Sequence, residues 1–141
     1  RGVADWDPEP VAQADLESAP LVKLANLILS DAVVQRASDI HIEPGGAKGG
    51  VVRFRIDGVM RQHMALPVAA VSRIVSRIKV LGKLDIADRM RPQDGRARIQ
   101  VLTRSYDLRI STAPTRAAEK AVIRNLVPDT AQTLAHRGLA P

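Results

Sequence analysis

The sequence predicts an α+β domain, a mostly antiparallel sheet with helices packed on one of its faces. Three observations lead to this class. Apolar residues recur at helical spacing in two segments, residues 18–36 and 67–82. Short runs that alternate apolar and polar residues occupy the intervals, as in half-buried strands. Turn signals such as Asp57-Gly58 separate neighbouring runs by a few residues, which favours hairpins and hence antiparallel pairing.

The first half of the chain is expected to form one helix and three strands. Ser18 can cap a helix that begins there and ends near Arg36. Alternating apolar and polar residues then predict strands, which a glycine loop and the Asp57-Gly58 turn separate. The expected strands are Ser38–Pro44, Val51–Arg55 and residues 59–62, and the glycine loop is Gly45–Gly50.

The second half is expected to begin with a helix and to continue with an arginine-rich hairpin. Pro67 opens the helix, Gly82 ends it, and Lys79 lies off its apolar stripe. Asp94-Gly95 is a turn signal, so residues 91–96 are predicted to form a turn before the hairpin. The expected strands are Ala97–Leu102 and Tyr106–Ser111, joined by residues 103–105, and a last short strand at Ala121–Leu126.

Composition limits the class of protein. Of the 141 residues, 45% are hydrophobic, which is enough for one domain with its own core. That core must be aliphatic, because Trp6, Phe54 and Tyr106 are the only aromatic residues. The absence of cysteine excludes disulfides and thiolate zinc sites and agrees with a reducing cytoplasm. No apolar run approaches the about 20 residues that a membrane helix needs.

Charge is distributed unevenly along the chain. Residues 1–19 contain five acidic residues and one arginine and so have a net charge of −4. The remaining residues therefore have a net charge of +10, which gives the total of +6. A basic body attracts polyanions such as nucleotides, nucleic acid, anionic lipid or an acidic protein surface, although solubility alone can also explain it. We expect residues 1–19 to be a flexible acidic linker and residues 127–141 a second linker. Because the chain opens on Arg1-Gly2 rather than Met, we interpret it as part of a longer protein.

Seven arginines are concentrated in and next to the stretch Asp85–Thr115. They are Arg89, Arg91, Arg96, Arg98, Arg104, Arg109 and Arg116. A guanidinium group held on rigid backbone recognises phosphate or carboxylate through its planar fork. We therefore predict anion recognition by Arg91 and Arg96, which bracket the expected turn, and by Arg109 in the middle of a strand. Surface ion pairs with neighbouring aspartates are the alternative interpretation.

Other kinds of site receive less support from the residues. His41 alternates with two carboxylates, Asp39 and Glu43, on one face of a strand, but such faces are usually solvated, so no metal site is predicted. These carboxylates and the pair Asp85 and Asp88 lack a nucleophile-and-base arrangement. The loop Gly45–Gly50 does not have the GxxxxGK[ST] order of a phosphate loop. We expect the chain alone to have no ATPase activity.

Four motifs occur in a fixed order and carry a family resemblance. They are SDIHIEP at Ser38–Pro44, RFRIDGVM at Arg53–Met60, LDIADRMRPQDGR at Leu84–Arg96 and DLRIST at Asp107–Thr112. The sequence closely resembles the N-terminal domain of the type II secretion and type IV pilus assembly ATPases over roughly residues 20–126. Met90 is a departure, because the family often has a basic residue there.

The resemblance implies a fold, a parent protein and a role for specific arginines. It implies a PAS-like domain followed by a RecA-like ATPase core that holds the Walker motifs, ATP and Mg²⁺. It further implies a hexamer at the cytoplasmic face of the inner membrane, working with platform proteins of a secretion or pilus system. Arg96 and Arg109 are implied to be arginine fingers that act on the bound nucleotide, with Arg91 as a further nucleotide-binding candidate.

Two alternatives to a regulatory domain of such a motor stay open at this point. A basic nucleic-acid-binding module would use the same positive charge, but the aromatic residues that stack on bases are nearly missing and no helix-turn-helix signal is present. A protein-docking domain would instead direct its arginines at acidic residues of a neighbour.

Overall fold

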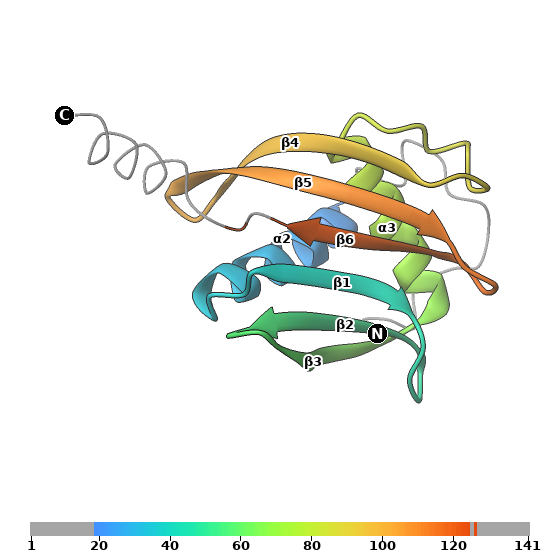
Figure 1. The fold of residues 1–141 in the computed structure, drawn as a ribbon, viewed down its shortest axis with the longest axis horizontal. Coiled ribbons are helices and arrows are strands. Elements are labelled where there is room, and N and C mark those ends of the chain that lie inside the picture. The colour runs from blue at the N-terminus through green and yellow to red at the C-terminus, as the bar shows by residue number, and fades with distance from the viewer. Residues whose placement is uncertain (1–18, 125, 127–141) are drawn as a thin grey trace.

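Six antiparallel strands form one sheet, and two helices lie against one of its faces (Figure 1). The computed structural model describes residues 19–124 and 126, so most of the first expected linker and all of the second lie outside the described residues. The strand order is β3-β2-β1-β6-β5-β4. The elements are α2 (Ala19–Val34), β1 (Asp39–Pro44), β2 (Gly49–Ile56), β3 (Val59–Pro67), α3 (Val68–Leu81), β4 (Gln93–Val101), β5 (Arg104–Pro114) and β6 (Glu119–Arg124). The predicted α+β class is confirmed.

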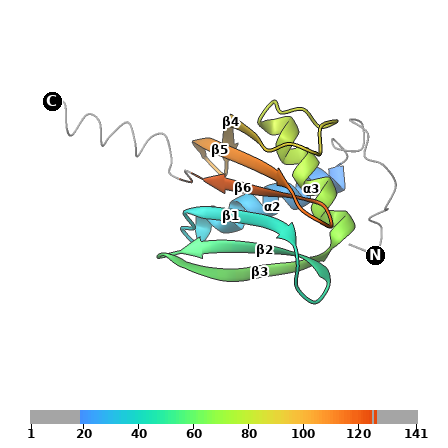
Figure 2. The same cartoon turned by 45° about the vertical axis from the view of Figure 1, so that its right-hand side comes forward.

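Apolar and polar residues alternate along the strands because only one face of the sheet is buried. In β1, Ile40 and Ile42 are buried, whereas Asp39 before them and His41 between them are only partly buried. The buried residues face α2 and α3, and both views of the molecule place the two helices on the same side (Figure 2). Among the described residues, the other face of the sheet carries no helix. This open face carries the polar residues that alternate with the buried ones, such as Asp39 and His41 of β1.

The first half of the chain folds as a three-stranded meander. Asp57 and Gly58 both have positive φ angles, 51° and 79°, as the predicted tight hairpin turn requires. The strand after this turn extends to Pro67 and is therefore longer than expected. The glycine loop is shorter than expected, because Gly49 already belongs to β2.

The expected turn at residues 91–96 is wrong, because β4 already begins at Gln93. Asp94 and Gly95 lie within the strand, opposite Ser111 and Ile110 of β5. The glycine serves close packing: a Cβ at Gly95 would lie 2.7 Å from the carbonyl oxygen of Gly82. The hairpin connection is also shorter than predicted, since Arg104 pairs with Val101 and only residues 102–103 lie between the strands.

Helix α3 differs from its prediction in one residue and in how it ends. Lys79 was expected off the apolar stripe, yet its side chain is 0% exposed. The helix ends near Gly82 as expected, but the left-handed residue of the cap is Lys83, with φ 58°. The N–H of Leu84 donates to the carbonyl oxygen of Lys79 at 2.8 Å, which closes the helix end.

Strand β6 is the last strand of the sequence but lies in the middle of the sheet. It pairs with β1 on one side, where Ile123 is opposite Ile40, and with β5 on the other, where Ile123 is opposite Ile110. These three isoleucines are buried. The pairing therefore joins the meander of the first half to the arginine-rich hairpin of the second half.

Candidate anion-binding site

Three arginines from three adjacent strands lie in one row on the open face of the sheet. Arg96 of β4 is directly opposite Arg109 of β5, and Arg109 is directly opposite Arg124 of β6. Directly opposed residues of antiparallel strands have Cβ atoms about 4.5–5.5 Å apart on the same face. All three are exposed, whereas their neighbours Ala97, Leu108 and Ile123 are buried toward the helices. We call Arg96, Arg109 and Arg124 the arginine row.

The arginine row has no internal neutralisation. No hydrogen bond or ion pair joins the side chain of Arg96, Arg109 or Arg124 to another described residue. A hollow of about 200 Å³ lies at Arg96 and Arg109, and Asp94 and Ser111 also line it. Like charges directly opposite one another destabilise a sheet, so this arrangement is unfavourable unless an anion neutralises it. The row therefore presents guanidinium groups of the kind that bind phosphate oxygens.

The other half of the open face is charge-balanced. The Arg55 Nε atom lies 3.4 Å from Asp39 Oδ2, and Arg53 donates a hydrogen bond to Glu43 Oε1 at 3.2 Å. Burial lowers the pKa of His41, outweighing the opposite effect of Glu43 and Asp39, so the imidazole between the two pairs is neutral near pH 7. Its Nε2 atom is buried and has no hydrogen-bond partner among the described residues. The two arginines of β2 on the open face, Arg53 and Arg55, are thus paired, unlike the arginine row.

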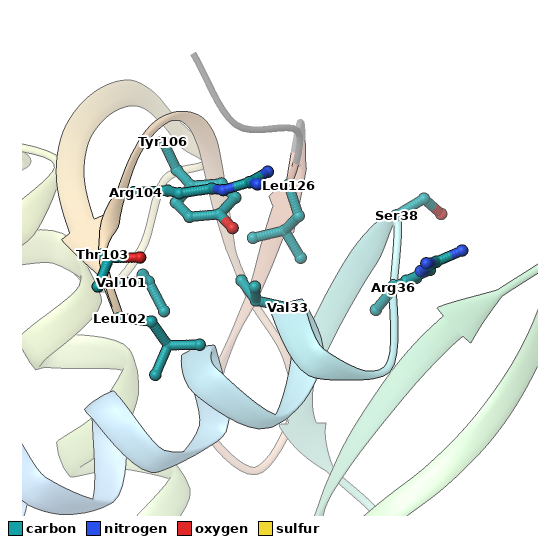
Figure 3. A pocket seen from close by; sticks show the side chains of 10 residues that line it. Val33, Arg36, Ser38, Val101, Leu102, Thr103, Arg104, Tyr106 and Leu126 are labelled. Carbon is teal, nitrogen blue, oxygen red and sulfur yellow. The ribbon is translucent and has the colours of Figure 1, made fainter. Parts of the chain in front are cut away.

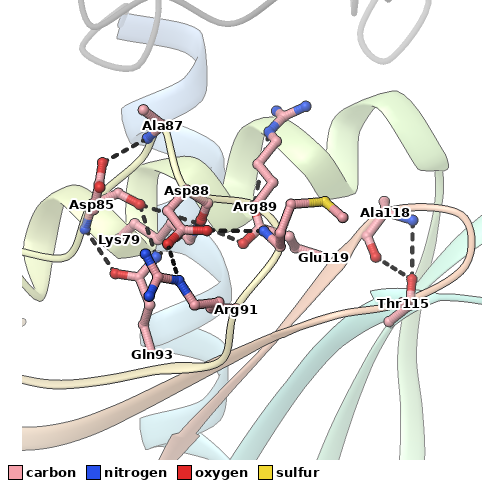
Figure 4. Close-up of polar contacts among 11 residues, drawn as sticks. Lys79, Asp85, Ala87, Asp88, Arg89, Arg91, Gln93, Thr115, Ala118 and Glu119 are labelled. Atoms are coloured by element: carbon pink, nitrogen blue, oxygen red, sulfur yellow. Dashed lines mark hydrogen bonds and ion pairs between the residues drawn. The ribbon is translucent and has the colours of Figure 1, made fainter.

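Arg91 does not join the arginine row. It lies in the loop before β4, its side chain is 83% exposed, and its Nε atom is 2.9 Å from Asp88 Oδ2 (Figure 4). The pKa of Asp88 is lowered, mainly because its carboxylate accepts a hydrogen bond from the backbone N–H of Met90, with a further contribution from Arg91. The sequence-predicted candidates therefore divide: Arg96 and Arg109 are neighbours, and Arg91 is held by an ion pair in a separate loop.

A polar network around the buried Lys79 side chain fixes that loop to the rest of the domain (Figure 4). Lys79 Nζ forms an ion pair with Glu119 of β6 and donates to the carbonyl oxygen of Asp88 at 2.8 Å and of Asp85 at 3.4 Å. The Gln93 side chain donates to the same two carbonyl oxygens and accepts from the Asp85 N–H. Sequence reasoning missed this network, since a lysine beside an apolar stripe is normally solvated.

A larger cavity, of about 520 Å³, lies where the end of α2 meets the β4–β5 hairpin (Figure 3). Arg104 lines this cavity, because side chains alternate along β5 and Arg104 shares the side of the buried Tyr106. The other lining residues are Val33, Arg36, Ala37, Ser38, Val101, Leu102, Thr103, Tyr106 and Leu126. Arg104 is consequently on the opposite face from Arg109, although only five positions separate them in the sequence.

The described residues form neither a metal site nor a membrane-spanning helix. No group of three or more His, Cys, Asp or Glu side chains within residues 19–124 and 126 is arranged to hold a metal ion. In the same part of the chain, neither helix has the length and apolar character needed to cross a bilayer. Asp39 and Glu43, considered above as acid–base candidates, are instead engaged with Arg55 and Arg53.

An α+β domain with a polar, arginine-bearing open face is the class that the fold and the site define, and comparison with known proteins identifies the family. The family model described as Type II/IV secretion system protein matches residues 14–141, and the chain belongs to this family. The resemblance to the N-terminal domain of the type II secretion and type IV pilus assembly ATPases, inferred from four motifs, is thereby confirmed.

Three curated relatives show how much of a protein the chain represents. It is 50% identical over 111 residues to the type IV pilus assembly ATPase PilB of Myxococcus xanthus, covering 78% of this chain and 19% of that protein. It is 45% identical to type II secretion system protein E of Xanthomonas campestris, with coverage of 84% and 21%. For type II secretion system protein E of Pseudomonas aeruginosa the identity is 41%, with coverage of 98% and 28%. The chain spans from 19% to 28% of the length of these relatives.

Proposed function

We propose that this domain regulates a secretion or type IV pilus assembly ATPase by directing Arg96 and Arg109 at the phosphate groups of bound ATP. The observation that carries the proposal is the direct cross-strand opposition of two exposed arginines that have no ion-pair partner among the described residues. The relatives named above include an ATPase of pilus assembly, which supplies the chemical class of the anion. Movement of the domain would then be coupled to hydrolysis.

In this proposal the domain supplies charge and the parent protein supplies the nucleotide site. A RecA-like core of the same protein holds ATP and Mg²⁺, because this chain has no phosphate loop. The transition state of phosphoryl transfer spreads negative charge over the γ-phosphate oxygens, and guanidinium groups from another domain stabilise that charge. The sheet fixes both backbones, so little reorganisation is needed when the phosphates are reached.

The proposal also includes the setting of the parent protein. We expect it to assemble as a hexamer in the cytoplasm at the inner membrane, in contact with neighbouring subunits and with platform proteins of the secretion or pilus system. Arg91 is a secondary nucleotide-binding candidate, since its ion pair with Asp88 is exposed and exposed pairs are worth only about 0–1 kcal/mol. Nucleic acid is not an expected partner.

The test is ATP hydrolysis by the full-length parent with single substitutions. Arg96→Ala or Arg109→Ala should lower the rate by about 10³-fold or less, the low end of arginine-finger effects, while the melting temperature stays near that of the parent. Lysine at either position should restore little, because a point charge does not reproduce the planar fork. Arg104→Ala is the matched control, since Arg104 lies on the opposite face of β5. Hydrolysis at the parental rate in both alanine variants would refute the proposal.

A further inference from the structure

The third member of the arginine row has no role in the function proposed above. Arg124 is the last residue of β6, outside the stretch Asp85–Thr115 that the sequence singles out. It is nevertheless a direct cross-strand neighbour of Arg109, because the two are a register pair. The pairing of β5 with β6 therefore adds a third guanidinium group to the same face.

The acidic residue opposite Arg124 on β1 does not neutralise it. Asp39 of β1 is the register partner of Arg124 on the other side of β6. Its carboxylate oxygen Oδ2, however, contacts Arg55 Nε at 3.4 Å and His41 Nε2 at 3.9 Å. No ion pair joins Asp39 to Arg124, and no other described residue forms one with Arg124. Its guanidinium group is thus exposed and has no ion-pair partner among the described residues.

The rows on either side of the arginine row have a different character. On one side, Arg98 is opposite Asp107. On the other, the Ser111 hydroxyl donates to Asp94 at 2.7 Å. The like charges are therefore concentrated at a single level of the sheet, where three of them occupy consecutive strands. Repulsion among three opposed cations opposes folding, and a ligand with several adjacent anionic groups would relieve it.

We propose that Arg124 is a third phosphate-binding residue, and that the arginine row as a whole grips a polyphosphate rather than a single phosphate group. This inference rests on the proposed function, since it assigns the same ligand to a longer site. Neighbouring strands are about 4.8 Å apart, so the three guanidinium groups present a linear set of donors across β4, β5 and β6. A chain of linked phosphates matches such a set better than one compact anion does.

The experiment measures binding of inorganic tripolyphosphate to the 141-residue chain by calorimetry, at low salt and with Mg²⁺ omitted. Arg124→Ala should weaken binding about threefold to tenfold, as should Arg96→Ala and Arg109→Ala, because each removes one charge-assisted contact. Arg124→Lys should recover part of the affinity, and inorganic monophosphate should bind far more weakly and respond less to Arg124→Ala. Arg104→Ala is again the control.

The outcomes separate the two proposals. Weaker binding in the Arg96 and Arg109 variants with unchanged binding in Arg124→Ala would overturn this inference and leave the proposed function standing. Failure of tripolyphosphate to bind, or tighter binding of a short DNA duplex at equal phosphate concentration, would also overturn this inference, whereas the proposed function is refuted by parental hydrolysis rates in the Arg96 and Arg109 variants. Thermal melting of each variant checks folding: if Arg124→Ala and Arg124→Gln both unfold the chain, Arg124 is a structural residue and the inference is wrong.

Discussion

Replacing Lys79 by methionine should lower the free energy of unfolding by about 3 kcal/mol, because it leaves a carboxylate buried without its partner. The Lys79 and Glu119 side chains are 0% and 6% exposed and form an ion pair. Removal of one member of such a pair typically costs about 3–5 kcal/mol. Arg89 Nε remains 3.9 Å from the Glu119 carboxylate, which places the expected value at the lower end.

The assay is urea and thermal denaturation followed by circular dichroism. For a domain of this size, about 3 kcal/mol corresponds to a fall in melting temperature of roughly 10 °C or more. Lys23→Met is the matched control, because Lys23 is an exposed lysine in helix α2 and its replacement should change stability by no more than about 0.5 kcal/mol. The double variant Lys79→Met with Glu119→Leu should recover part of the loss, since an apolar pair often substitutes well for a buried ion pair.

A loss of less than about 1 kcal/mol in the free energy of unfolding of Lys79→Met would contradict this prediction. Such a small loss would mean that the Lys79 ammonium group lies in solvent. The prediction is also contradicted if the double variant loses more free energy of unfolding than the two single variants lose in sum. In that case the hydrogen bonds from Lys79 to the carbonyl oxygens of Asp85 and Asp88 would dominate over the ion pair.

Two further predictions concern packing and pH. Gly95→Ala should destabilise the chain by about 1–3 kcal/mol in urea, because the added Cβ would lie 2.7 Å from the Gly82 carbonyl oxygen; unchanged stability would show that α3 and β4 are not in close contact. Burial lowers the folded-state pKa of His41 below 6.5, so protonation favours the unfolded chain and stability should decline as the pH falls from 7.5 to 5.5. His41→Gln should flatten that decline, and an equally steep decline in this variant would assign it to other groups.

Local chemistry allowed much of the fold and part of the site to be predicted. Alternation and turn residues were sufficient for the β2–β3 hairpin, where Asp57-Gly58 has the expected conformation. The same dipeptide type at Asp94-Gly95 was misread, because there the glycine is required by a neighbouring helix end rather than by a turn. Composition around a glycine does not distinguish these two requirements, since only the tertiary contact does.

The residues that could not be singled out from the sequence have one physical cause in common. Arg96 and Arg109 belong to one local hairpin and are both candidates from the sequence, although Arg96 is expected there in the turn. Arg124 joins them only through the register of β5 with β6. Lys79 and Glu119 meet across the gap between a helix and a strand 40 positions later in the chain. Contacts of this kind depend on how whole elements pack, which residue spacing does not encode.

The sheet cannot be completed during synthesis until β6, its last strand in sequence, has been made. Residues 39–67 can pair among themselves as soon as they are synthesised, but β1 stays an unpaired edge until residue 124 has left the ribosome. An exposed edge with buried-type residues such as Ile40 and Ile42 is a template for pairing with other chains. The last few residues of the described domain therefore close its sheet, and a chain that stops short of β6 should aggregate rather than persist as a smaller folded unit.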